Sequence, residues 1–203
     1  PSSLMHSSQP LTLSKLPSRA ASRVYSEDYL MEFNSAPTSN EYHQFYGKYI
    51  SLVDPDKLPD ELTKQPGELK QLLSTLSDPE VDCLHEPYTW TLKQVIFHFI
   101  DCQRIFSHRL NRIAVGDETP IPGIDQNKYV SAIDYSPIPM ANLLDEFEHL
   151  RRANCLLYDR LPNASMTNMG IASDNPVSAR ANLFILAGHV RYHLKIIKRR
   201  INS

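Results

Sequence analysis

The chain has 203 residues, of which 41% are hydrophobic and 22% charged, a balance typical of one folded domain. Its 21 lysines and arginines against 23 aspartates and glutamates give a net charge of −2, which favours neither a nucleic-acid nor a membrane partner. No apolar run reaches the roughly 18 to 20 residues of a membrane span. The 3 widely spaced cysteines fit a reducing compartment. We therefore expect a cytoplasmic protein.

The first 40 residues differ in composition from the rest of the chain. Residues 1–26 contain no acidic residue and are rich in serine and proline, without the apolar stretch of a secretory signal. A targeting peptide, a non-native leader or an extended arm packed on the domain would each explain this composition. We predict a Ser/Pro-rich leader or arm over 1–40 and one domain over 41–203.

The domain itself has helical periodicity, whereas strand alternation and hairpin dipeptides are almost absent. Long helices are predicted over 60–76, 91–116, 139–161 and 175–200. The second begins with a capping box, in which Thr91 is the N-cap and Gln94 the N3 residue, and ends at Gly116. The fourth is expected to begin at Asn175-Pro176, because proline is favoured in the first turn of a helix.

The link between the second and third predicted helices decides the topology. It spans about 20 residues and contains several prolines, which is too long for a tight antiparallel connection. A crossover of this length returns the chain to the end of the bundle where the second helix began. The sequence thus predicts an all-α four-helix bundle with one long crossover between helices 2 and 3, preceded by an extended N-terminal arm.

Two histidines stand out on the fourth predicted helix. His189 and His193 are one turn apart in the middle of its apolar face, so their imidazoles point the same way. Each imidazole needs a partner in the core, which is either a hydrogen-bonding neighbour or a shared metal ion. His98 on the second helix could join them, because facing helices of a bundle meet in its core. Three imidazoles would leave a metal such as zinc or nickel with an open position, as in catalytic sites.

Several segments in order resemble a known family. They include Trp-Thr-Leu-Lys-Gln-Val-Ile-Phe-His at 90–98, Pro-Ile-Pro-Gly-Ile-Asp-Gln-Asn at 120–127, and Ala-Gly-His-Val-Arg-Tyr-His at 187–193. Over about 42–201 the chain resembles the DinB-like superfamily, and within it the YfiT-type metal-dependent hydrolases.

The resemblance implies an up-down-down-up bundle, a homodimer, and one zinc or nickel ion held by His98, His189 and His193. The reactions known in that superfamily imply either a metal-dependent hydrolase or a transferase that uses a low-molecular-weight thiol. Cys102 and Gln103 stand where the family usually has Thr-Glu, so any role for a carboxylate at 103 is in doubt. Tyr192 stands where relatives often carry a further histidine, next to the ligand position 193.

The chemistry of such a site requires further residues around the metal. Asp101, one turn from His98, is the candidate catalytic base, or it orients a histidine instead. Arg109, with Arg104 as the alternative, is the candidate to bind the carboxylates of a thiol cofactor or small-molecule substrate. Cys102 is either a fourth ligand or a small buried thiol. A non-catalytic metal-binding or stress-related protein is the third interpretation.

Overall fold

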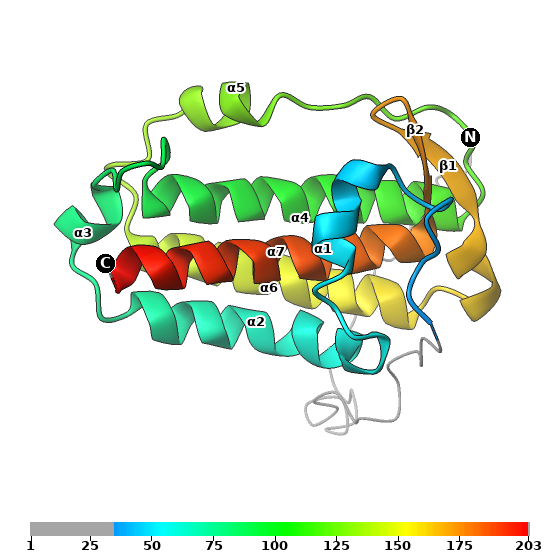
Figure 1. The fold of residues 1–203 in the computed structure, drawn as a ribbon, viewed down its shortest axis with the longest axis horizontal. Helices are drawn as coiled ribbons and strands as arrows, with labels where there is room; N and C mark the ends of the chain where they lie inside the picture. The colour runs from blue at the N-terminus through cyan, green and yellow to red at the C-terminus, as the bar shows by residue number, and fades with distance from the viewer. Residues whose placement is uncertain (1–34, 203) are drawn as a thin grey trace, which may run out of the picture.

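Four long helices lie side by side and form the frame of the molecule (Figure 1). They are α2 (Leu58–Leu73), α4 (Leu92–Ala114), α6 (Met140–Asp159) and α7 (Ala179–Ile201). The structure, a computed structural model, describes residues 35–202, so the predicted arm lies outside the described residues as far as residue 34. Helices α2 and α7 run in one direction and α4 and α6 in the other, which confirms the up-down-down-up bundle.

The predicted long crossover joins the end of α4 to the start of α6 and passes back along the length of the bundle (Figure 1). It carries the short helix α5 (Gln126–Ser131), which packs against α4. Two other short helices, α1 (Gly47–Ile50) and α3 (Asp78–Asp82), precede α2 and α4. None of the helices within residues 35–202 is long and apolar enough to cross a membrane.

The ends of α4 follow the local signals in the sequence. The Thr91 hydroxyl accepts a bond from the Gln94 backbone N–H at 3.2 Å, and the Gln94 side chain accepts one from the Thr91 N–H at 2.9 Å. This reciprocal pair satisfies two N–H groups that the first turn of a helix leaves free. At the other end Gly116 has φ +80°, a conformation that glycine adopts at little cost.

The expected start of the last helix is wrong, because a small hairpin occupies that segment. Strand β1 (Met169–Ala172) pairs antiparallel with β2 (Asn175–Ser178), and α7 begins only at Ala179. The Ser178 hydroxyl caps α7 by accepting a bond from the Ala181 N–H at 3.0 Å. The turn consists of Ser173 and Asp174, both with positive φ. Most two-residue turns of this kind contain Asn-Gly or Asp-Gly, and this one does not, which is why the sequence did not predict it.

The hairpin also fixes the beginning of the crossover. Ile121 donates a backbone bond to the Ile171 carbonyl, and its own carbonyl accepts one from the Ser173 N–H, both at 2.9 Å. These two bonds hold the crossover against β1 at the end of the bundle where α4 ends and α7 begins (Figure 1). The turn of the hairpin is therefore held in place beside α4.

Helix α1 lies against α7 at a very close backbone approach. A Cβ atom built on Gly188 would lie 2.1 Å from the backbone oxygen of Tyr49. Because the obstacle is backbone, it cannot turn away as a side chain would. Gly188 thus allows α1 to pack directly on the part of α7 that carries His189.

We expect Gly188→Ala to lower the free energy of unfolding by about 2–3 kcal/mol, the cost of overpacking a close contact. Gly67→Ala is the matched control, because Gly67 is exposed within α2 and an added Cβ would meet nothing within 4 Å. That change should stabilise the protein by about 0.5–1 kcal/mol through helix propensity. Urea unfolding of both variants tests this, and equal effects of the two substitutions would contradict it.

Candidate metal centre

The structure brings His98, His189 and His193 together in the middle of the bundle. Their ligand nitrogens all lie within 4.8 Å of one another, and the Nε2 atoms of His98 and His189 are 3.0 Å apart. His98 comes from the second turn of α4, whereas His189 and His193 come from successive turns of α7. The packing of α4 against α7 therefore brings the three imidazoles together, as the sequence predicts.

Aromatic rings hold the imidazoles in place. Tyr49 meets the ring of His189 edge-on, with the centroids 5.2 Å apart. Phe99 meets the rings of both His189 and His193 at 5.8 and 5.5 Å, and Trp90 lies against His98 at 5.1 Å. Close-packed rings of this kind leave each imidazole little freedom to rotate.

Burial keeps all three imidazoles neutral. It lowers the pKa of His98 to about 4. Burial, together with the charge of His98 and of Lys48, lowers the pKa of His193 to about 3. The pKa of His189 lies well below its usual value because of burial first, then the neighbouring histidines and the cations Arg151 and Lys48. At neutral pH each imidazole thus has a lone pair that is free to bind a metal.

The histidines lie in a cavity of about 830 Å³, which we call the histidine cavity. Side chains from α1, α4, α7, the crossover and the hairpin turn line it. The lining includes the three histidines with Lys48, Tyr49, Trp90, Cys102, Phe106, Arg109, Asp125, Ser173 and Tyr192. This volume falls in the range of small-molecule sites.

Arg109, the candidate to bind a carboxylate, lines the histidine cavity about three turns beyond His98 on α4. It is 4% exposed, and its Nη2 donates a bond to the Ser173 hydroxyl at 2.8 Å. Its Nε is buried without a hydrogen-bond partner among the described residues. Ser173 lies beside Arg109 because it is part of the hairpin turn, and no pattern in the sequence predicts this contact.

Cys102 also lines the histidine cavity, with its sulfur 3.7 Å from Nε2 and 3.8 Å from Nδ1 of His98. Burial raises the pKa of this thiol, so it is protonated at neutral pH. The sulfur is not part of the group of nitrogens that lie within 4.8 Å of one another. The geometry thus favours the buried thiol beside a histidine over the fourth ligand.

Asp101 and Gln103 are not among the described residues that line the histidine cavity. Burial raises the pKa of Asp101, whose electrostatic neighbours are Arg104 and Glu146. Gln103 is buried elsewhere, and its side-chain oxygen accepts a bond from the Asn154 amide of α6 at 3.0 Å. The Gln103 amide oxygen therefore makes a structural contact between α4 and α6, away from the histidine cavity.

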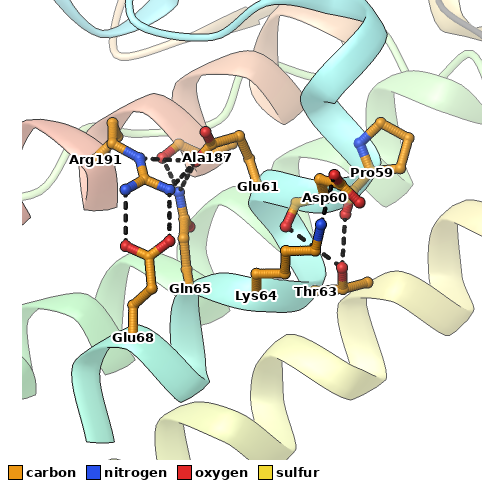
Figure 2. A network of polar contacts seen from close by, with 9 residues as sticks. All are labelled: Pro59, Asp60, Glu61, Thr63, Lys64, Gln65, Glu68, Ala187 and Arg191. Atoms are coloured by element: carbon orange, nitrogen blue, oxygen red, sulfur yellow. Dashed lines mark hydrogen bonds and ion pairs between the residues drawn. The ribbon is translucent and has the colours of Figure 1, made fainter. Parts of the chain in front are cut away.

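A polar network outside the cavity fixes the rotation of α7. Arg191 lies between His189 and His193 in sequence, and its guanidinium pairs with Glu61 and Glu68 of α2 (Figure 2). Gln65, between these two glutamates, donates a bond to the Ala187 carbonyl at 2.9 Å. Figure 2 shows these contacts joining one face of α7 to α2. With that face tied to α2, the histidines on the other face point towards α4.

The donor set fits a divalent metal ion. Zinc with tetrahedral nitrogen ligands at about 2.0 Å would hold those nitrogens roughly 3.3 Å apart. The closest pair here is at 3.0 Å, and all three nitrogens lie within 4.8 Å of one another. Neutral imidazoles that face an open cavity are the ligands such ions take in catalytic sites.

Comparisons with known proteins agree with this site. Two proteins of Oceanobacillus iheyensis, each named "Putative metal-dependent hydrolase", are similar in sequence. One is 27% identical over 153 residues, covering 74% of this chain and 87% of the relative. The other is 23% identical over 151 residues, covering 73% and 86%.

Solved structures share the fold. YfiT from Bacillus subtilis, a four-helix bundle of unusual topology, superposes with a TM-score of 0.64 at 18% identity, covering 86% of this chain and 97% of YfiT. A mycothiol-dependent maleylpyruvate isomerase superposes with a TM-score of 0.56 at 16% identity, covering 71% of this chain and 60% of the isomerase. Residues 61–197 match the family model of the DinB superfamily, and the chain therefore belongs to that superfamily.

Proposed function

We propose that this protein binds one divalent ion, zinc or nickel, through His98, His189 and His193, and acts as a metal-dependent hydrolase on a small-molecule substrate. The observation that carries the proposal is the convergence of three neutral imidazoles, two of them buried and that of His193 partly buried, on an open cavity. Three nitrogen ligands leave one coordination position for water or substrate. When bound, such an ion lowers the pKa of a coordinated water towards neutrality.

The residues of the chain itself would exclude water and orient the substrate. Tyr49, Trp90, Phe106 and Tyr192 give the histidine cavity aromatic walls that would cover an apolar part of a substrate. The Arg109 Nε–H is buried without a partner among the described residues and could donate to a carboxylate. Arg109 lies about three turns along α4 from His98, so this carboxylate would be held away from the metal. We expect a substrate with an anionic group separated from the atom that reacts.

The second candidate function is transfer of a low-molecular-weight thiol, and two observations favour it. Asp125 lines the histidine cavity, but no carboxylate oxygen among the described residues lies within 4.8 Å of all three imidazole nitrogens. A metal deprotonates a coordinated thiol directly, so this reaction needs no base from the protein. Arg109 would then hold the carboxylate of the thiol. The homodimer and the cytoplasmic location stay predictions from the sequence.

The first test is the metal content of the full chain by inductively coupled plasma mass spectrometry. We expect close to one zinc or nickel per chain in the wild type, and its loss in His189→Ala, because a chelating imidazole is removed. His149→Ala is the control, since His149 is exposed on α6. A wild type without metal, even after zinc and nickel are supplied, would make the three histidines hydrogen-bonded core residues.

The neutral histidines also predict how the stability of the metal-free protein depends on pH. A histidine that binds a proton near pH 6.5 when unfolded but near pH 4 or below when folded favours the unfolded state in acid. The free energy of unfolding should therefore fall as the pH falls below about 6.5, by up to roughly 1.4 kcal/mol per pH unit for each histidine.

His98→Gln should make this pH dependence shallower by about one proton. Urea unfolding of the chelator-treated proteins between pH 7.5 and 5 provides the measurement. Identical slopes for the wild type and His98→Gln would show that His98 is not held neutral by burial.

Thiol dependence separates the two candidate reactions, and Arg109→Met tests the carboxylate-binding role that both give to Arg109. With an electrophile as acceptor, cysteine and cysteamine are matched thiols that differ by one carboxylate. If Arg109 binds that carboxylate, the substitution should raise the KM for cysteine about tenfold or more, with little change for cysteamine. Arg104→Met is the control, because Arg104 pairs with Glu146 on the outside of the bundle. Hydrolysis of esters without any thiol dependence would instead favour the hydrolase.

A further inference from the structure

A second cavity, of about 560 Å³, lies between α2 and α6 and shares no lining residue with the histidine cavity. We call it the α2–α6 cavity. Its wall from α2 includes Leu62, Pro66 and Gly67, and its wall from α6 includes Arg151 and Cys155. Most of this wall is apolar, so the cavity suits the apolar body of a small organic molecule.

Arg151 is the unusual member of this wall. The residue is 1% exposed, and none of its three guanidinium nitrogens has a hydrogen-bond partner among the described residues. Burial lowers the pKa of Arg151 to about 10, so the side chain still carries its charge at neutral pH. The α2–α6 cavity thus has a buried cation in its wall with its hydrogen-bonding groups unused.

The neighbours of Arg151 do not replace a hydrogen-bonding anion. The guanidinium lies over the ring of Phe147 at 5.4 Å, a cation–π contact that leaves the N–H groups unbonded. Tyr158, Cys155 and Glu61 are near enough to act electrostatically on it. The Glu61 carboxylate is already bound by Arg191 and Gln65 (Figure 2). An arginine buried in this state costs free energy unless a further partner pairs with it.

Charged side chains at the edge of the α2–α6 cavity also favour an anionic ligand. Lys64 and Arg152 contribute to the lining, although Lys64 also pairs with Asp60. The one acidic lining residue, Glu148, pairs with Lys70. A carboxylate matches a guanidinium with two parallel hydrogen bonds, and one negative charge balances Arg151 without leaving a net charge in an apolar wall.

We propose that the α2–α6 cavity binds an organic monocarboxylate, with the carboxylate paired to Arg151 and the apolar body against Leu62 and Pro66. This site is separate from the histidine cavity and does not depend on the reaction proposed for it. The ligand class follows from one buried cation in a mostly apolar wall, which suits neither a neutral molecule nor an inorganic dianion.

Isothermal titration calorimetry of the full chain with hexanoate tests this proposal. Hexan-1-ol has the same apolar body without the charge, and inorganic phosphate has the charge without the apolar body. We expect saturable binding of one hexanoate, with much weaker binding of the other two probes. Arg151→Met should weaken hexanoate binding at least tenfold, because it removes charge-assisted hydrogen bonds.

Two control variants locate the bound hexanoate. Arg109→Met changes the buried arginine of the histidine cavity, and Arg152→Met changes an exposed arginine at the edge of the α2–α6 cavity. Both should retain binding within a few-fold of the wild type. The melting temperature of Arg151→Met without ligand should equal or exceed that of the wild type, since the variant no longer buries an unpaired charge. If this variant does not fold, Arg151→Lys replaces it, and the loss of the planar fork should still weaken binding.

Three results would overturn the proposal. The first is the absence of saturable hexanoate binding. The second is equal binding of hexanoate and hexan-1-ol, which would mean that Arg151 plays no part. The third is loss of binding in Arg109→Met with retention in Arg151→Met or Arg151→Lys, which would place the carboxylate in the histidine cavity instead.

Discussion

The packing of α7 against α4 is the constraint on which the rest of the structure depends. The two helices are antiparallel, and their contact places the second turn of α4 opposite the middle of α7, so His98 meets His189 and His193. Phe99 follows His98 on α4, and its ring contacts the imidazoles of both His189 and His193 edge-on. A shift of either helix by one turn, about 5 Å, would separate the histidines.

Helices α2 and α1 stabilise the position of α7 relative to α4. The ion pairs of Arg191 with Glu61 and Glu68 tie the opposite face of α7 to α2. Gly188 lets the Tyr49 backbone approach from the remaining side, and the Tyr49 ring then covers His189. Because packing and ion pairs act on different faces of α7, they restrict its rotation together. A site built on rigid helices in this way is held more precisely than one built on loops.

Burial has opposite consequences for the histidines and the arginines of this bundle. It lowers the pKa of each imidazole below neutrality, so the histidines lose their charge and become good metal ligands. An arginine does not lose its proton in the same way, because its pKa stays far above neutrality even after burial, as that of Arg151 does. Arg109 and Arg151 therefore remain buried cations with unused N–H groups, and each lines its own cavity. The same low dielectric thus prepares one site for a cation and favours anions at two others.

The sequence by itself determined the local features of this protein. The apolar spacing predicted the four long helices, and the Thr91 capping box and Gly116 predicted the ends of α4, because these signals act within one or two turns. The i, i+4 spacing placed His189 and His193 on one face for the same reason. The length of the crossover was enough to predict its topology. The position of His98 on the second predicted helix made it the candidate third ligand, because facing helices of a bundle meet in the core, and the resemblance implied the same three residues.

The tertiary structure decided what depends on distant residues. The Ser173-Asp174 turn has no glycine, so only its pairing with Ile121 and the cap on α7 explain why a hairpin replaces the start of a helix. Asp101 is one turn from His98, yet the packing of α6 on α4 gives it Glu146 and Arg104 as neighbours. The burial of Arg151 could not be predicted either, because an arginine among charged residues of α6 is indistinguishable from a solvated one until α2 and α4 pack against that helix. Helix periodicity is a local property, whereas burial depends on what the rest of the chain places on each face.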